Sequence, residues 1–277
     1  MNQLVMFFVM QLALIAVVLV LHTYMGLHII RRGIIFSDLV LDQLAAFGVV
    51  AGVAPGIRYG TPLSYVCAFA AVLLGSVLLA CAAPRHAHVP REAAIGILYG
   101  MALTASLMLA DKMRDGGIYF GKTLSGSMLW VSWRLIGVTV IVYLLLGIVH
   151  YLVRKPIMQL TDAPQDLHYR RIWDFLFFLT QGVITILIVP VAGVLLAYGF
   201  LMIPAAVGTL FSREWGRAML IGWLAGMGGC TVGIAASYRY DLPYGPTLLI
   251  SMSIIFLSAL VLRIRGGMMP QTVEVNQ

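Results

Sequence analysis

The chain has 277 residues, of which 61% are hydrophobic and only 10% are charged, and its mean hydropathy is +0.96. A soluble globular domain carries about 25% charged residues, so this composition excludes one and indicates a protein that crosses the membrane several times. The net charge of +7 does not indicate nucleic-acid binding, because the basic residues stand singly or in pairs between apolar runs. We predict one transmembrane domain over residues 1–265 and a short polar tail over residues 266–277.

Nine apolar segments approach the length of about 20 residues that a membrane-spanning helix needs. They cover residues 4–28, 36–55, 63–83, 93–110, 129–153, 172–189, 191–208, 218–237 and 246–263. The sixth and seventh are short and are joined by IVPVAG, so they are either two thin helices or one long broken helix. The predicted fold is therefore an all-α helical bundle with eight or nine transmembrane helices. The first segment lacks a basic stretch before it, so we expect a retained helix rather than a signal peptide.

The distribution of lysine and arginine predicts the orientation. With the N-terminus outside, the inner loops hold 12 of the 18 basic residues, namely Arg31, Arg32, Arg85, Arg91, Arg154, Lys155, Arg170, Arg171, Arg213, Arg217, Arg263 and Arg265. The outer side holds the other six, Arg58, Lys112, Arg114, Lys122, Arg134 and Arg239. Because basic residues are enriched in cytoplasmic loops, the N-terminus is expected outside and the C-terminus in the cytoplasm, which nine spans satisfy.

Three cysteines, Cys67, Cys81 and Cys230, lie in or beside apolar runs without a CxxC pair, so we predict neither a disulfide nor a zinc cage. The motifs HExxH and GxSxG are absent from the sequence, and we predict no enzymatic activity for this chain. His22 and His28 flank Tyr24, but at a spacing of six residues they do not share a helix face well, and we do not predict a metal site from them.

Two acids stand in an otherwise apolar helix, in the stretch RRGIIFSDLVLDQLAAFG (31–48). Asp38 and Asp42 are four residues apart, so their carboxylates share one face of the helix. Acids within a membrane segment normally face the interior of the bundle, where two of them would attract a cation. The alternative is structural: Asp38 would cap the helix, and Asp42 would pair with Arg31 or Arg32 of a neighbouring copy.

The stretch LLAYGFLMIPAAVGTLFSREWGRAMLIGW (195–223) interrupts two apolar helices. After Pro204 comes a small-residue segment and then a charged cluster, in which Ser212 can cap the next helix and Glu214 suits its first turn. We expect a short amphipathic helix on the cytoplasmic surface, where a soluble partner could dock. An ordinary capped loop is the alternative.

A second interruption is SYRYDLPYGPTLLIS (237–251), on the predicted outer side. Pro243, Gly245 and Pro246 break the chain between two apolar helices, which predicts a rigid turn. Asp241 could cap the preceding helix or bind a ligand.

These segments also carry a resemblance. RRGIIFSD, EAAIGILYG, LLAYGFLMIPAAVGTLFSREWGRAM and YDLPYGP occur in the order and at about the spacing seen in the permease subunits of bacterial ABC importers for zinc, manganese or iron. The resemblance covers residues 20–260, and the block from IPAA to YDLPYGP is its most specific part. It implies a permease in the bacterial cytoplasmic membrane that takes up a divalent metal ion and binds no cofactor of its own.

The resemblance further implies the partners. Two ABC ATPase subunits would bind ATP and dock in the cytoplasm, and a periplasmic or lipid-anchored substrate-binding protein would deliver the metal. A second copy of the chain would complete a homodimer with the path at its two-fold axis. The alternatives are an ABC permease for a metal chelate or another small substrate, and a proton-coupled secondary transporter with Asp38 and Asp42 as its relay.

Residue by residue, the resemblance assigns ATPase coupling to the segment after IPAA, through Pro204, Thr209, Ser212, Arg213, Glu214 and Arg217. In the family, the second helix carries an Asp and, four residues later, a His that line the ion path. Counted from the arginine pair these positions are Asp38 and Asp42, whereas counted from Gly48 the histidine position is Gln43. A second family histidine, in the fourth helix, falls at Gly100 and is therefore absent here. Without the two imidazoles, the remaining carboxylate and amide oxygens suit a harder ion such as Mn²⁺.

Overall fold

The computed structural model describes residues 3–58, 61–82, 89–126 and 131–265, so the predicted tail 266–277 lies outside the described residues. Within these ranges the chain is helical, with no strand. The helices are α1 (Gln3–Arg32), α2 (Phe36–Val53), α3 (Pro62–Cys81), α4 (Arg91–Asp111), α5 (Gly116–Ser125), α6 (Trp133–Leu152), α7 (Arg154–Asp162), the 3₁₀ turn η2 (Pro164–Asp166), α8 (Arg170–Phe211), α9 (Trp215–Tyr240) and α10 (Tyr244–Arg265). The predicted all-α class is confirmed.

Eight of the described helices are long and apolar enough to cross a membrane, and the short α5 and α7 are not among them. The most buried of the eight is α8, with 72% of its apolar window inside the bundle, whereas α4 and α6 bury only 22%. Lipid tails are as apolar as leucine, so the exposed apolar faces of α4 and α6 are compatible with a membrane. The high burial of α8 makes it the central helix.

The bundle has two chemically different ends, which the long helix α1 connects. At one end, here called the basic end, Arg32, Arg91 and Arg170 surround the buried carboxylate of Asp174. At the opposite end, the hydroxyl of Tyr244 donates a 2.8 Å hydrogen bond to Gln11 of α1. The 20 residues of α1 between Gln11 and Arg31 rise about 30 Å, which is the thickness of the hydrocarbon core.

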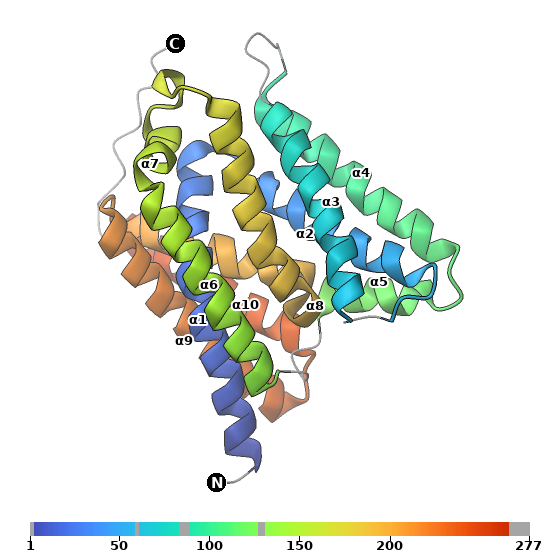
Figure 1. Ribbon diagram of the computed structural model, residues 1–277. Coiled ribbons are helices and arrows are strands. Elements are labelled where there is room, and N and C mark those ends of the chain that lie inside the picture. The colour runs from blue at the N-terminus through green and yellow to red at the C-terminus, as the bar shows by residue number, and fades with distance from the viewer. Residues whose placement is uncertain (1–2, 59–60, 83–88, 127–130, 266–277) are drawn as a thin grey trace.

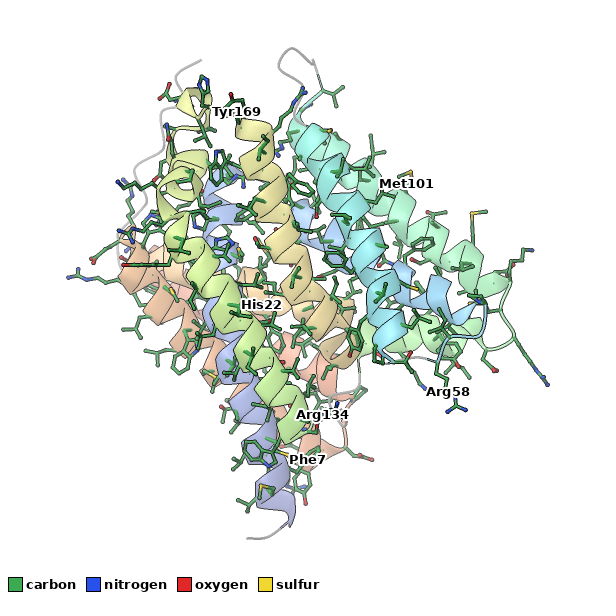
Figure 2. All side chains as sticks on the ribbon, viewed as in Figure 1. Phe7, His22, Arg58, Met101, Arg134 and Tyr169 are labelled. Atoms are coloured by element: carbon green, nitrogen blue, oxygen red, sulfur yellow. The ribbon has the colours of Figure 1, made fainter. Side chains whose placement is uncertain are left out.

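Figure 2 shows the same separation, with Tyr169 at the basic end and Phe7, Arg58 and Arg134 at the other. Arg58 and Arg134 are thus on the side of the molecule away from Asp174. The division of the arginines between two ends therefore agrees with the division that the sequence predicts between two membrane faces.

The 42-residue helix α8 doubles back on itself (Figure 1). It begins at the basic end, where Asp174 pairs with Arg32, and it is followed there by Arg213, whose carbonyl accepts a hydrogen bond from Arg31. Its middle lies at the opposite end, because Ala192 packs against Gly126. The reversal is at Gly193, where φ is +79° and ψ is 161°.

Gly193 divides α8 into a first arm, residues 170–192, and a second arm, residues 194–211. At 1.5 Å per residue the arms are about 35 and 27 Å long, so each can cross the membrane. They correspond to the two short segments predicted at 172–189 and 191–208. Counting both arms, the described helices provide nine crossings from eight apolar helices.

Only glycine fits this reversal. A Cβ atom on Gly193 would lie 2.4 Å from the backbone nitrogen of Gly126, and a positive φ is strained for any other residue. Pro190 lies three residues earlier and lacks the N–H that the helical ladder needs. Pro190 and Gly193 together explain why the predicted boundary was ambiguous: the helix continues through the proline and turns at the glycine.

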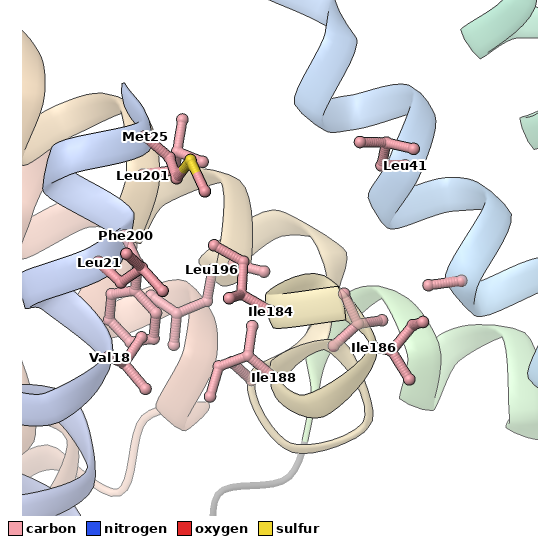
Figure 3. Close-up of a cluster of buried hydrophobic side chains, with 14 of the residues drawn as sticks. Val18, Leu21, Met25, Leu41, Ile184, Ile186, Ile188, Leu196, Phe200 and Leu201 are labelled. Atoms are coloured by element: carbon pink, nitrogen blue, oxygen red, sulfur yellow. The ribbon is translucent and has the colours of Figure 1, made fainter. Parts of the chain in front are cut away.

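The core lies between α1 and the two arms of α8 (Figure 3). Ile184 and Ile188 of the first arm and Phe200 of the second arm share one cluster with Val18 and Met25 of α1. Backbones approach closely in this region, since a Cβ atom on Gly26 of α1 would meet the Leu201 carbonyl at 2.2 Å. Small residues at such contacts are typical of helix packing in membranes.

The expected separate amphipathic helix after Pro204 is not formed. Residues 204–211 continue the second arm of α8, a bend covers residues 212–214, and α9 begins at Trp215. The second arm stays helical because it packs closely against α9. The Pro204 carbonyl lies against Gly222 of α9, and Gly208 near the end of the arm lies against the Ala218 carbonyl. The short surface helix at the basic end is instead α7, which buries Ile157 and Leu160.

Candidate cation path between α2 and α8

Asp38 and Asp42 lie one turn apart on α2, are 2% and 1% exposed, and face the first arm of α8. Across the interface, the amide nitrogen of Gln181 donates a 2.7 Å hydrogen bond to Oδ1 of Asp38. Thr185, one turn after Gln181, is a hydrogen-bond partner of Asp42. Two acids on α2 therefore face an amide and a hydroxyl on α8, each pair spaced by four residues.

Three oxygen atoms at this interface are buried and have no hydrogen-bond partner. They are Oδ2 of Asp38, Oδ2 of Asp42 and Oε1 of Gln181. An unsatisfied buried acceptor costs about 1–3 kcal/mol, and more when it is charged. A cation placed against these oxygens would satisfy them and would offset the charge of the two carboxylates.

The surroundings define what kind of site this is. The phenol groups of Tyr143 and Tyr198 lie within electrostatic reach of both carboxylates. Within the described part of the chain, no three His, Cys, Asp or Glu side chains are close enough to share a metal ion. The arrangement is therefore an open set of oxygen ligands rather than a closed metal cage, and such oxygens suit hard cations.

Gln43 does not join the two aspartates. Its amide nitrogen donates a 2.9 Å hydrogen bond to the Ser106 hydroxyl on α4, on another face of α2. Of the three predicted path residues, the structure thus brings Asp38 and Asp42 together and leaves Gln43 apart. Sequence reasoning missed Gln181 and Thr185, although two polar residues four apart within the apolar segment 172–189 were the available signal.

The structural alternatives for the two acids are not what the structure shows. Asp38 makes no capping hydrogen bond, and the first backbone N–H of α2, that of Phe36, donates instead to Glu92 at 2.9 Å. Arg32 pairs with Asp174. Asp42 is buried inside a single protomer, so it offers no surface to an arginine of a neighbouring copy.

The predicted coupling residues are placed at or near the basic end. Pro204 is buried within the second arm of α8, and the Thr209 hydroxyl donates to the Ala206 carbonyl of the same arm. The bend that follows contains Ser212, whose hydroxyl accepts a 3.1 Å hydrogen bond from the Glu214 backbone N–H. The serine thus orders the bend rather than capping α9, for which no side-chain cap is formed.

The bend is tied to α1 and carries exposed charge. The guanidinium of Arg31 donates a 2.6 Å hydrogen bond to the Arg213 carbonyl and lies 3.8 Å above the Trp215 ring. Glu214 and Arg217 form a 3.0 Å ion pair, and both side chains are more than half exposed. The bend therefore exposes charged side chains, while Arg31 of α1 holds its backbone in place.

The other predicted turn lies at the opposite end and is shorter than expected. Asp241 ends α9 in the left-handed conformation, with φ +51°, and Pro243 precedes α10, whose first turn already contains Gly245 and Pro246. Asp241 and Pro243 line a cavity of about 560 Å³ with Phe7, Phe8 and Tyr238. A Cβ atom on Gly245 would lie 2.4 Å from the Ser125 carbonyl, so this turn also packs beside the Gly193 reversal.

Known proteins match the chain over almost its whole length. The sequence pattern of the ABC 3 transport family matches residues 6–263. The chain is 24% identical over 280 residues to the manganese transport system membrane protein MntC of Halalkalibacterium halodurans, which covers 97% of this chain and 92% of that protein. It is also 24% identical over 245 residues to an uncharacterized membrane protein of Synechocystis, with 83% and 85% of the two chains covered.

A solved structure has the same fold. PsaBC from Streptococcus pneumoniae, determined in complex with a Fab, superposes with a TM-score of 0.72 over 90% of each chain, at 17% identity. The family pattern spans every helix described above except the first residues of α1 and the last of α10. The resemblance seen in the sequence is thus confirmed, and the chain belongs to the ABC 3 transport family.

Proposed function

We propose that this chain is the permease subunit of an ABC importer that carries a divalent metal ion across the bacterial cytoplasmic membrane. Of the candidate ions, Mn²⁺ fits best. Membership of the ABC 3 transport family and the similarity to a manganese transport protein support this function. The observation that carries it is the set of three unpartnered buried oxygens of Asp38, Asp42 and Gln181.

The chemistry of these oxygens favours the choice of ion. Two carboxylates and one amide oxygen form a hard ligand set, which suits Mn²⁺ better than the imidazole- and thiolate-preferring Zn²⁺. With so few protein ligands, the ion keeps part of its water and is held only transiently. Transient binding is what a transport path requires, because the ion must leave as readily as it enters.

The first arm of α8 covers both carboxylates, so the path opens only when this arm shifts relative to α2. The Gly193 reversal provides the pivot, since it is the break within α8. The second arm runs from this pivot to the bend at residues 212–214. A force applied at the bend is thereby transmitted along α8 to the residues that cover the acids.

Residues 116–123, GGIYFGKT, match GxxxxGK[ST] but form the helix α5 rather than a phosphate-binding loop after a strand, so ATP would be hydrolysed by separate ATPase subunits. These would dock at the basic end against the exposed Arg213, Glu214 and Arg217. A substrate-binding protein would deliver the metal at the opposite end, which faces outside together with the N-terminus. Two copies of the chain would form the transporter.

The test is metal accumulation by cells that express this chain with its ATPase and substrate-binding protein, with Mn, Zn and Fe measured by elemental analysis. The variants are Asp42→Asn and, as a matched control, Asp111→Asn, whose carboxylate is 78% exposed. We expect the wild type and Asp111→Asn to accumulate manganese equally. Asp42→Asn should lower accumulation at least about tenfold at equal amounts of protein in the membrane, because it removes a charged ligand.

Two outcomes would contradict the proposal. If no metal rises in cells with the wild-type transporter, the cargo is a chelate or another small molecule. If manganese rises without the ATPase, the chain works as an ion-coupled secondary transporter and the facing acids serve as a proton relay.

A further inference from the structure

A cavity of about 590 Å³ lies at the basic end, where the segment after η2 enters α8. Its lining includes His168 and Tyr169 of this segment and Arg170 and Arg171 of the first turn of α8. Figure 2 shows Tyr169 at this end of the bundle. The cavity is separate from the cation path, and neither of the path aspartates lines it.

The surroundings of this cavity carry more positive charge than their carboxylates neutralise. The three arginines of the basic end share the single carboxylate of Asp174, and Arg170 and Asp174 both line the cavity. Arg171 also lines it and forms no ion pair within the described part of the chain. The lining contains one further acid, Asp166. Four guanidinium groups thus stand against two carboxylates, and the excess charge attracts an anion.

Hydrogen-bond donors are left over at the same place. Nε of Arg170 is buried without a hydrogen-bond partner, since it lies 3.7 Å from Oδ2 of Asp174. No side chain caps α8, and the Tyr169 carbonyl accepts a 2.9 Å hydrogen bond from the N–H of Ile172. The N–H groups of Arg170 and Arg171 precede this bond in the first turn. Free N–H groups and the positive end of the helix dipole are suited to phosphate oxygens.

An apolar groove of about 260 Å³ adjoins the cavity. It is lined by side chains of α3 and α8, namely Val77, Ala80, Cys81, Ile172 and Phe175, together with Arg171. Arg171 and Ile172 line both the cavity and the groove, so the two are joined. Val77 is 44% and Ile172 is 61% exposed, although both belong to membrane-spanning helices. Exposed apolar side chains on such helices are compatible with contact with lipid tails.

We propose that an anionic phospholipid of the leaflet at the basic end binds here, with its phosphate against Arg170, Arg171 and the start of α8 and one acyl chain in the groove. Basic pockets between membrane helices are typical sites for phospholipid head groups. The groove favours a lipid over a soluble phosphate compound, because a soluble compound would leave the groove empty. Tyr169 is 72% exposed and suits the same position, since tyrosine is enriched at the level of the head groups.

The test is thermal unfolding of the purified full-length chain in detergent, with dioleoylphosphatidylglycerol added as the anionic lipid. Dioleoylphosphatidylcholine has the same acyl chains without net charge, and glycerol 3-phosphate has the phosphate without acyl chains. A ligand that binds only the folded protein raises Tm with its concentration. We expect the anionic lipid to raise Tm in this way, and the other two compounds to leave it unchanged at the same concentration.

Two pairs of variants locate the effect, each measured against its own Tm without lipid. Arg171→Gln should raise the dissociation constant of the anionic lipid about fivefold, whereas Lys155→Gln, which removes an exposed charge of α7 outside the cavity, should not change it. Val77→Trp fills the groove and should weaken binding. Its control is Val66→Trp, since Val66 is 59% exposed and lies on the same face of α3 three turns away, outside the groove.

Three results would overturn the proposal. Equal Tm shifts with the anionic lipid and with phosphatidylcholine would show unspecific stabilisation by lipid. Equal losses in Arg171→Gln and Lys155→Gln would show attraction spread over the whole basic end. An equal shift with glycerol 3-phosphate would assign the cavity to a soluble phosphate compound. The proposal requires only that the chain spans a membrane, so none of these results bears on metal transport, which is measured separately.

Discussion

The amide of Gln181 donates a 2.7 Å hydrogen bond to Oδ1 of Asp38, across 143 positions of sequence. This contact orients both partners. The amide nitrogen is occupied by the carboxylate, so Oε1 of Gln181 is left free, and Oδ2 of Asp38 is left free as well. Two buried oxygens, one on each helix, are thus left without a protein partner.

We predict that Gln181→Leu impairs transport and that Gln43→Leu does not. Both glutamines are fully buried, but only Gln181 faces the acids, whereas Gln43 bonds to Ser106. Metal accumulation per permease in the membrane should fall at least about tenfold in Gln181→Leu. Gln43→Leu should cost about 0.6 kcal/mol of stability, the average for a hydrogen bond between membrane helices, and keep its transport rate. Equal losses in both variants would remove Gln181 from the path.

We predict that Gly193→Ala destabilises the protein strongly. The positive φ alone costs about 1–3 kcal/mol for a residue with a side chain, and the new Cβ would meet the Gly126 nitrogen at 2.4 Å. The matched control is Gly147→Ala in α6, where the added Cβ meets nothing within 4 Å and the helix should gain about 0.5–1 kcal/mol. Thermal unfolding in detergent measures both, and a normal Tm for Gly193→Ala would refute the reversal at this residue.

We predict that Asp174→Asn is the most damaging charge removal at the basic end. Asp174 is almost fully buried and pairs with Arg32, Arg91 and Arg170, so its loss leaves buried guanidinium groups uncompensated. Breaking a buried ion pair in this way costs about 3–5 kcal/mol. Glu214→Gln, which removes an exposed partner of Arg217, should cost less than about 1 kcal/mol. Comparable unfolding temperatures for the two variants would contradict the prediction.

We predict that Arg213→Glu abolishes transport without unfolding the chain. The Arg213 contact to Arg31 uses the backbone carbonyl, so the substitution keeps that contact and changes only the charge presented by the bend. Arg31→Gln should instead loosen the bend, because it removes both the hydrogen bond and the stacking on Trp215. Metal accumulation and ATPase binding to the detergent-purified variants measure this. Normal ATPase binding by Arg213→Glu would show that the bend is not the docking element.

Much of the architecture follows from local patterns. A run of about 20 apolar residues crosses the membrane as a helix, because in lipid every backbone N–H and C=O group must be hydrogen-bonded within its own segment. The arginines fell into two groups, and the structure separates Asp174 and its arginines from Arg58 and Arg134. The four-residue spacing of Asp38 and Asp42 was enough to place them on one face, and both are buried.

The partners of these residues could not be read in the same way, since a partner across a helix interface depends on the rotation and register of two helices. Asp42 and Gln43 point about 100° apart around α2, so the rotation of this helix determines which of them faces α8. The contacts of Asp38 with Gln181 and of Gln43 with Ser106 fix that rotation. The reversal of α8 at Gly193 rather than Pro190 was decided by the close approach of Gly126. The Phe177 ring of α8 contacts both His28 of α1 and His150 of α6, which no local pattern foretells. The sequence by itself determined which segments cross the membrane and which faces are polar, because these depend on each helix alone. Only the tertiary structure decided which polar faces meet.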